Sequence, residues 1–297
     1  MQPAKSQSPG ASLEAIQHHY DVGNSFYRLW LDGSLTYSSA LWEEHDTLET
    51  AQLRKIDYHI SQARGHQAKR VLDIGCGWGS VLKRLVAACG VEQAVGLTLS
   101  AAQAKWIASF DIPQIEVCLE SWADHVPQAP YDSIISIGAF EHFAKWGLSK
   151  AEKIAGYREF FSRCHRWLHS GGRVSLQTIA YGSSMSQEAI QASPISRFLA
   201  KFIFPDSDIP ALAEIVEATE GLFEIVAMRN DREHYARTSR TWLERLNANR
   251  AEANKLVGEK TVAQYCRYLE IWAHSFEIGT QALLRMTLLR LDKPWKK

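Results

Sequence analysis

The sequence has no excess of charge of either sign. Its 297 residues include 33 Lys and Arg and 33 Asp and Glu, and the pI is about 7.2. A surface that binds nucleic acid needs a basic excess, and so does strong attraction to anionic lipid headgroups. We therefore expect neither a nucleic-acid partner nor a nucleic-acid substrate.

Paired cysteines and long apolar runs are also lacking. The five cysteines, at positions 76, 89, 118, 164 and 266, show neither C-x-x-C spacing nor a Cys/His metal-ligand pattern. We therefore expect free thiols, no metal site and a cytoplasmic location. No apolar run reaches the roughly 18 residues of a membrane span, and the first ten residues are polar. The sequence thus predicts neither a membrane-spanning segment nor a secretion signal.

Strand and helix patterns alternate from Arg70 onward, and no internal repeat interrupts them. Strand-like runs lie at 70–75, 94–99, 114–120, 131–138, 172–180, 223–229 and 283–291, with helical patterns at 49–64, 100–110, 151–168 and 238–276. This order predicts an α/β fold with a doubly wound, mostly parallel seven-stranded sheet that ends in an antiparallel pair. Gly171 and Gly172 are expected to cap the helix before the fifth strand.

The remaining segments suggest a division of the chain. We expect a disordered tail at 1–11, an N-terminal helical cap at 12–66, and a main domain at 67–297 with a lid insertion at about 181–215. The insertion contains the apolar piece 195–204 and follows the carboxyl end of a strand, where α/β sheets bind ligands. A helical pattern at 12–30 carries the polar string His18-His19-Tyr20-Asp21, which makes Tyr20 a candidate functional residue.

The most informative stretch is a glycine-rich loop after the first strand. Gly75, Gly77 and Gly79 alternate with other residues, and alternate glycines let a ligand approach the backbone closely. A dinucleotide fingerprint would need glycine at position 80, which is Ser80, and an acidic residue about 20 positions further on, where the chain has Leu97-Thr98-Leu99. NAD is therefore disfavoured, and Asp73-x-Gly75-x-Gly77-x-Gly79 resembles motif I of class I S-adenosylmethionine (SAM) methyltransferases, which have a Rossmann-like fold.

Further strings resemble one branch of these enzymes, the cyclopropane-fatty-acid synthases and mycolic-acid cyclopropane synthases, over nearly the whole chain. They are His19-Tyr20-Asp21-Val22-Gly23-Asn24 with Phe26-Tyr27, Thr36-Tyr37-Ser38, Gly96-Leu97-Thr98-Leu99-Ser100 with Gln103, Ser136-Ile137-Gly138-Ala139-Phe140-Glu141-His142-Phe143, and His234-Tyr235-Ala236-Arg237-Thr238. The order of these strings, more than any one of them, indicates the family.

The resemblance implies a binding site for SAM. Thr98 and Gln103 would hydrogen-bond the ribose in place of the usual carboxylate, and Trp122 would pack on the adenine. Tyr37 and Ser38 would close over the methionine part. Residues with a general cofactor-binding role would be Asp73, Gly75, Gly77, Gly79, Leu99 and Ile137.

The resemblance also implies a pocket for a bicarbonate ion that acts as base. Its positions here are Ser39 in place of a cysteine, Glu141, Gln177 in place of a histidine, the Ile179 backbone and Tyr235. An amide can donate a hydrogen bond to an anion, but it carries no positive charge. We therefore take Glu141, Tyr235, Gln177, Ser39, His142 and Tyr20 as the candidate catalytic residues.

Two chemistries stay open. In the first, Gln177 still holds bicarbonate or Glu141 is the base, and a methyl or methylene group reaches a carbon of an unsaturated acyl chain or another hydrophobic acceptor. In the second, the ion is lost and Glu141 or His142 assists methylation of a carbon or amine in a smaller metabolite. Peripheral membrane contact and a homo-oligomer are compatible with either. A SAM-binding regulator without catalysis and an NAD-dependent oxidoreductase are the rival classes.

Overall fold

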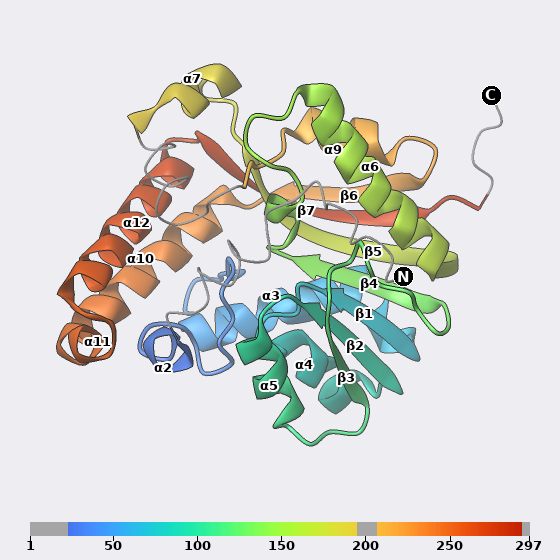
Figure 1. Ribbon diagram of the computed structural model, residues 1–297, viewed down its shortest axis with the longest axis horizontal. Helices are drawn as coiled ribbons and strands as arrows, with labels where there is room; N and C mark the ends of the chain where they lie inside the picture. The colour runs from blue at the N-terminus through green and yellow to red at the C-terminus, as the bar shows by residue number, and fades with distance from the viewer. Residues whose placement is uncertain (1–22, 195–206, 293–297) are drawn as a thin grey trace, which may run out of the picture.

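The computed structural model describes residues 23–194 and 207–292 (Figure 1). The expected tail at 1–11, the candidate Tyr20 and the apolar piece at 195–204 lie outside the described residues. Within them, no helix has both the length and the apolar character required to cross a bilayer. The division into tail, cap, main domain and lid stays a prediction.

A seven-stranded sheet runs through the centre of the molecule (Figure 1), in the order β3-β2-β1-β4-β5-β7-β6. The strands are β1 (Arg70–Ile74), β2 (Gln93–Thr98), β3 (Ile115–Leu119), β4 (Tyr131–Ile137), β5 (Leu168–Tyr181), β6 (Phe223–Asn230) and β7 (Gln281–Arg290). The first five pair in parallel, whereas β7 is antiparallel to both β5 and β6. This confirms the predicted class, including the antiparallel end of the sheet.

Alternate strand residues point to opposite sides of the sheet, and apolar side chains occur on both sides. Helices therefore cover both faces of the sheet. On one face, α3 (Leu48–Gln62), α4 (Ser80–Cys89) and α5 (Ala101–Ala108) pack over Val71, Ala94 and Ile135. On the other face, α6 (Lys150–Trp167) and α9 (Leu212–Thr219) pack over Leu72, Ile134 and other apolar residues. The short elements are α2 (Asn24–Tyr27), η1 (Gly65–Gln67), η2 (Phe140–His142) and α7 (Gln187–Ala192).

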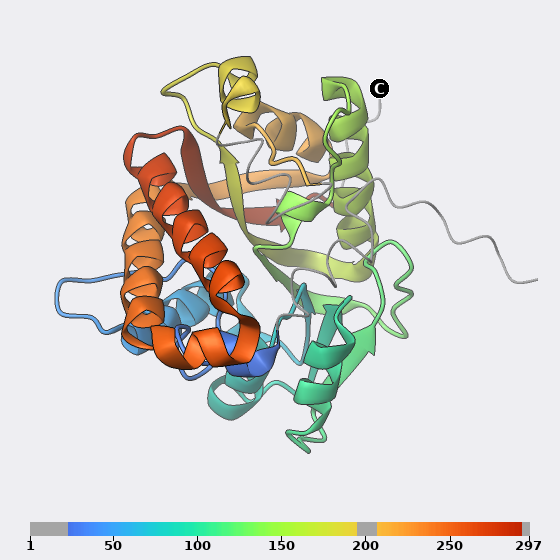
Figure 2. The ribbon, with the colours of Figure 1, turned by 60° about the vertical axis from the view of Figure 1, so that its left-hand side comes forward.

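A third apolar cluster joins α2 to the C-terminal helices, and Figure 2 shows α2 beside these helices. The sequence predicts one helical stretch at 238–276, but the structure has three helices there: α10 (Arg232–Ala248), α11 (Arg250–Val257) and α12 (Glu259–Glu277). Asn249 ends α10 with a non-helical backbone and donates to the Leu29 carbonyl, and Gly258 breaks the next helix at φ +83°. The breaks let α10 and α12 pack against each other beside the sheet.

The expected glycine cap before β5 is wrong. Helix α6 ends at Trp167, and Leu168 is already extended (φ −84°, ψ 147°) and belongs to β5. Gly171, at φ +73°, lies instead where the pairing of β4 with β5 slips between Tyr131 and Ser133. The two glycines thus form an irregularity inside the strand, which a sequence pattern does not distinguish from a helix end.

Candidate active site

The glycine loop joins β1 to α4 in a conformation that needs glycine. Gly75, Gly77 and Gly79 have φ of +80°, +54° and +82°, in the region that side chains disfavour. A Cβ on Gly75 would lie 2.4 Å from the Cβ of Ala139. The N–H groups of Gly75 and Cys76 both donate to the Leu97 carbonyl, at 3.0 Å each, which fixes the loop to the end of β2.

Two cavities flank this loop, and most of the predicted cofactor residues line them. The first contains Thr98, Leu99, Gln103 and Trp122 together with Gly75 and Gly77. The second contains Tyr37, Ser38, Asp73, Ile137 and Gln103 together with the same two glycines. Gly79 lies behind the loop, where a Cβ would meet Ile107 at 2.9 Å. Because Gly75 and Gly77 have no side chains, the two cavities leave room for a ligand such as SAM against the loop backbone. We call these two cavities together the cofactor cradle.

The side chains predicted to hold the nucleoside are already ordered by the protein. The Thr98 hydroxyl donates to Gln103 Oε1 at 2.7 Å, so Gln103 offers its amide N–H groups to a ligand. Trp122 is buried, with its ring 5.2 Å from Phe143 and 5.4 Å from Phe160 between centroids. Its packing supports the ring as one wall of the cavity.

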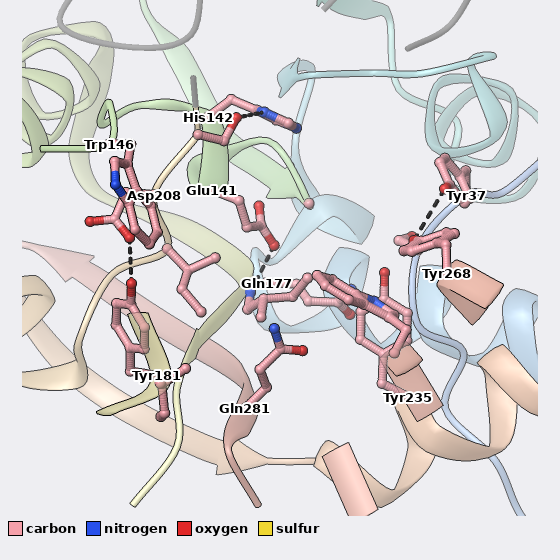
Figure 3. A pocket seen from close by; sticks show the side chains of 17 residues that line it. Tyr37, Glu141, His142, Trp146, Gln177, Tyr181, Asp208, Tyr235, Tyr268 and Gln281 are labelled. Carbon is pink, nitrogen blue, oxygen red and sulfur yellow. Dashed lines mark hydrogen bonds between the residues drawn. The ribbon is translucent and has the colours of Figure 1, made fainter. Parts of the chain in front are cut away.

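A third cavity, drawn in Figure 3, shares lining residues with each of the first two. Its aromatic lining residues are Tyr37, Trp146, Tyr181, Tyr235, Tyr268 and Trp272. Its polar ones include Glu141, His142, Gln177, Asp208 and Gln281. Gly138 lines all three cavities, so the cofactor cradle and the aromatic cavity meet at a residue without a side chain.

Glu141 is one of two carboxylates, with Asp208, that line this cavity. It lies in η2, directly after β4, and its Oε1 accepts the backbone N–H of Ile179 at 2.7 Å. Oε2 is buried and meets no donor at hydrogen-bond geometry in the described part of the chain. Burial raises the pKa of Glu141 to about 7, against the lowering effect of the Ile179 N–H. A carboxyl group with such a pKa can accept a proton near neutral pH.

His142 lies between the cofactor side and the aromatic side. It lines both the first and the third cavity, and its Nδ1 is 2.8 Å from the Ser207 hydroxyl. Burial lowers the pKa of His142 to about 4. The imidazole is therefore neutral at pH 7 and brings no charge to the site.

Gln177 is held by residues that the sequence did not single out. Its Oε1 accepts from Arg285 Nε at 2.9 Å and lies 3.4 Å from His59 Nε2. Because its oxygen faces these partners, Gln177 offers the cavity an N–H donor. Burial and the charge of Arg285 hold the pKa of His59 well below its usual value, so His59 is neutral as well.

Arg285 is fully buried and links several parts of the site. Besides Gln177, it donates through Nη1 to Asp231 Oδ2 and through Nη2 to the carbonyls of Ser39 and Ala40, at 3.3 and 2.9 Å. Ser39 itself is buried, and its hydroxyl donates to Ala40, so it lies behind the cavity wall rather than in it. Of the candidate catalytic residues, the structure thus brings together Glu141, His142, Gln177 and Tyr235.

The polar residues that sequence reasoning missed lie mainly on α3. Gln52 donates to the carbonyls of Thr36 and Ser38, Lys55 donates to the Ser38 hydroxyl, and His59 bonds Ser175. Their spacing of three and four residues places them on one helical face, which here is the face turned to the sheet. Arg285 could have been noticed in the sequence, because it is a charged residue within the mostly apolar run 282–289.

Comparisons with known proteins agree with this architecture. The family model described as mycolic acid cyclopropane synthetase matches residues 7–286. The cyclopropane mycolic acid synthase MmaA2 of Mycobacterium tuberculosis is 34% identical over 292 residues, which cover 94% of this chain and 97% of the relative. The structure of the cyclopropane synthase CmaA1 complexed with SAH and CTAB superposes with a TM-score of 0.84, at 31% identity, covering 95% of this chain and 99% of that one.

A coclaurine N-methyltransferase structure, with a TM-score of 0.78 at 18% identity, covers 96% of this chain and 84% of its own; it supports the fold alone. The family inferred from the sequence strings and the choice of SAM over NAD are both confirmed. The chain belongs to the mycolic acid cyclopropane synthetase family of SAM-dependent methyltransferases.

Proposed function

We propose that this enzyme transfers the methyl group of SAM to a carbon–carbon double bond in a hydrophobic, lipid-like acceptor bound in the aromatic cavity. The observation that carries the proposal is Gly138, which lines the cofactor cradle and the aromatic cavity alike. An acceptor in the aromatic cavity can reach the methyl donor there without crossing a side chain. The names of the relatives, cyclopropane mycolic acid synthases, support an unsaturated acyl chain as acceptor.

SAM supplies an activated methyl group when bound, so the protein has mainly to position the acceptor and exclude water. Addition of the methyl group to a double bond leaves a positive charge on the acceptor. The aromatic rings of Tyr235, Tyr268 and Trp272, which line the cavity, favour such a charge. Tyr235 is held by stacking on Phe276, with centroids 4.6 Å apart.

For a ring to close, the methyl group just transferred must then lose a proton, and its carbon must form a bond with the positively charged carbon of the acceptor. We assign this proton to Glu141 Oε2, which accepts no hydrogen bond at standard geometry from the described residues. The residues fit a bicarbonate ion poorly. The Ile179 N–H already donates to Glu141, and Gln177 offers a neutral amide where the family resemblance implies a histidine. We therefore derive no step from bicarbonate.

A second candidate is simple methylation of a carbon or an amine, without ring closure. The neutral side chains of Gln177 and His142 favour it, because neither holds a positive charge that would fix an anionic base. Glu141 can accept a proton in this reaction too.

Mass spectrometry with SAM deuterated in its methyl group separates the two. The enzyme is incubated with free oleic acid, with vesicles of unsaturated phospholipid, and with a hydrophobic secondary amine. Ring formation retains two of the three deuterium atoms, whereas simple methyl transfer retains all three. We expect two in an acyl product; a product with three, or transfer to the amine alone, contradicts ring formation.

Two other measurements test the remaining proposals. Peripheral membrane contact predicts that the protein sediments with vesicles. Self-association predicts a mass above 33.5 kDa in light scattering. A cytoplasmic location stays a prediction. Gln177→His, which restores the residue type of the family resemblance, is expected to change the rate and its dependence on added bicarbonate.

A further inference from the structure

A glutamine at the start of β7 lies in the wall of the aromatic cavity without a hydrogen bond. Gln281 is 7% exposed and lines this cavity together with Glu141 and Tyr181 (Figure 3). Its Oε1 atom is buried, and within residues 23–194 and 207–292 no donor reaches it at hydrogen-bond geometry. Gln281 is not among the candidate residues that the sequence singled out, and the methyl-transfer chemistry proposed above does not use it.

The register of the sheet determines where this amide lies. Gln281 pairs directly with Tyr181. Two residues further along β7, Leu283 pairs with Ile179, whose N–H donates to Glu141 at 2.7 Å. Residues two apart on a strand point to the same face, so Gln281 lies about 7 Å along the strand from the level at which Glu141 is held. It can therefore contact an acceptor group that is only a few bonds away from the reacting carbon.

The polar neighbours on this side of the cavity bond to one another instead. The Tyr181 hydroxyl donates to Asp208 Oδ1 at 2.5 Å and accepts from Gln191 Nε2 at 3.0 Å. Asp208 Oδ2 in turn accepts from Lys153 Nζ at 3.0 Å. Gln281 has no share in this network, although it stands directly opposite Tyr181 in the sheet.

The fold alone gives little reason for an amide at this position. A buried polar group without a hydrogen bond costs free energy, and an apolar side chain of similar length would avoid that cost. The backbone does not depend on the amide, because pairing with β5 holds the strand and the Gly182 N–H donates to the Thr280 carbonyl at 2.9 Å. A ligand group that bonds to the amide of Gln281 would remove the cost.

The charges around the cavity restrict which ligand group this can be. Its described lining residues include neither lysine nor arginine, and His142 is neutral at pH 7 because burial lowers its pKa to about 4. The cavity thus offers no side-chain cation to balance a carboxylate. Asp208 already accepts from Tyr181 and Lys153, so it offers little to an ammonium group on this side. An uncharged group fits these walls better.

A hydroxyl group matches the amide in either orientation. It is uncharged, it donates to an amide oxygen, and it accepts from an amide N–H. We propose that Gln281 binds a hydroxyl group of the acceptor, close to the double bond, and so selects a hydroxylated acyl chain over a plain one. The inference rests on the proposed function, because that function places the acceptor in the aromatic cavity. A plain chain is disfavoured because it leaves the buried amide unpaired.

Two fatty-acid esters that differ by one hydroxyl group test the assignment on the full chain. Methyl ricinoleate carries a hydroxyl close to its double bond, and methyl oleate is the counterpart without one. Their dissociation constants are measured in the presence of S-adenosylhomocysteine. We expect the unmodified protein to prefer methyl ricinoleate about 10- to 100-fold and Gln281→Leu to lose this preference. The kcat/KM values for methyl transfer to the two esters should show the same difference.

The stability without ligand separates a binding role from a structural one. Leucine removes the unpaired amide, so Gln281→Leu should melt at a higher temperature than the unmodified protein. Gln281→Asn keeps an amide on a shorter side chain and should retain part of the preference. Gln128→Leu makes the same change as Gln281→Leu at an exposed position and should leave the preference unchanged.

Several results would overturn the inference. A lower melting temperature of Gln281→Leu, with equal weakening of both esters, would assign Gln281 a structural role. Equal affinity of the unmodified protein for both esters would also contradict it, and so would an unchanged preference in Gln281→Leu.

The outcome is separable from the proposed function. If the unmodified protein methylates both esters equally well, only this inference fails. If it binds the esters with the expected preference but transfers no methyl group, the inference stands and the proposed reaction fails. If it binds neither ester, the aromatic cavity is not the acceptor site and both proposals fail.

Discussion

Glu141→Gln should remove activity and increase stability at the same time. The folded protein holds the pKa of Glu141 at about 7, above the 4.5 of an exposed glutamate. Folding thus favours the protonated form, and the ionised form is disfavoured by about 3 kcal/mol. This cost is absent below pH 4.5, grows as the pH rises, and is complete above pH 7. Glutamine keeps the shape and the bond from Ile179 and avoids the cost.

The stability of both proteins is measured by urea unfolding from pH 4 to 8. We expect the variant to exceed the unmodified enzyme by up to about 3 kcal/mol at pH 8 and to equal it near pH 4. Lys55 and Asp73 titrate in the same range, but they cancel in this difference. Methyl transfer should rise with pH through about 7 in the unmodified enzyme and fall by about 10²- to 10⁴-fold in the variant.

The exposed Glu270 on α12 supplies the control, since Glu270→Gln makes the same chemical change in water. Glu270→Gln should alter neither the free energy of unfolding nor the rate of methyl transfer. Equal stability of Glu141→Gln and the unmodified enzyme at pH 8 would show that the carboxyl group is hydrated and that its pKa is not raised. A variant with the original rate would place the base elsewhere.

Two further substitutions probe the cradle and its support. Gly75→Ala should abolish the SAM-induced rise in melting temperature, because its Cβ would lie 2.4 Å from that of Ala139. Gly90 also has a positive φ, at +68°, but a Cβ there would meet open space, so Gly90→Ala should bind SAM normally. Arg285→Met should lower the free energy of unfolding by about 3 kcal/mol, because the Oδ2 atom of the buried Asp231 loses its partner and only the pair of Oδ1 with the half-exposed Arg229 remains. Adding Asp231→Asn should recover part of this loss; no recovery would refute the ion-pair explanation.

The parts of the fold that sequence predicts are those governed by local patterns. The alternation of strands and helices located every strand of the sheet, and the glycine spacing located the cradle. The break at Gly258 was not found, because Thr238 to Phe276 keeps a helical pattern on both sides of it. The turn at Asn249 depends on a carbonyl from Leu29, more than two hundred residues earlier.

The site residues that belong to a sequence motif were predicted, whereas those that reach the site only through tertiary packing were missed. Glu141 and Gln177 were predicted by position in the family pattern, and both line the aromatic cavity. Lys55 and His59 belong to a helix whose sequence is typical of a charged, exposed helix. Only tertiary packing turns its polar face toward the sheet. Sequence also could not show that Ser39 lies behind the cavity wall, since that depends on Arg285.

Gln177 and Arg285 face each other directly across β5 and β7, and they share a hydrogen bond. We expect this arrangement to make the two positions interdependent during evolution. A histidine that became protonated at 177 would repel the guanidinium, and a shorter neutral residue at 285 would release the amide. Homologues should therefore change both positions together. The acid–base chemistry of this lineage would then shift by paired substitutions in the sheet, while the cavity walls stay as they are.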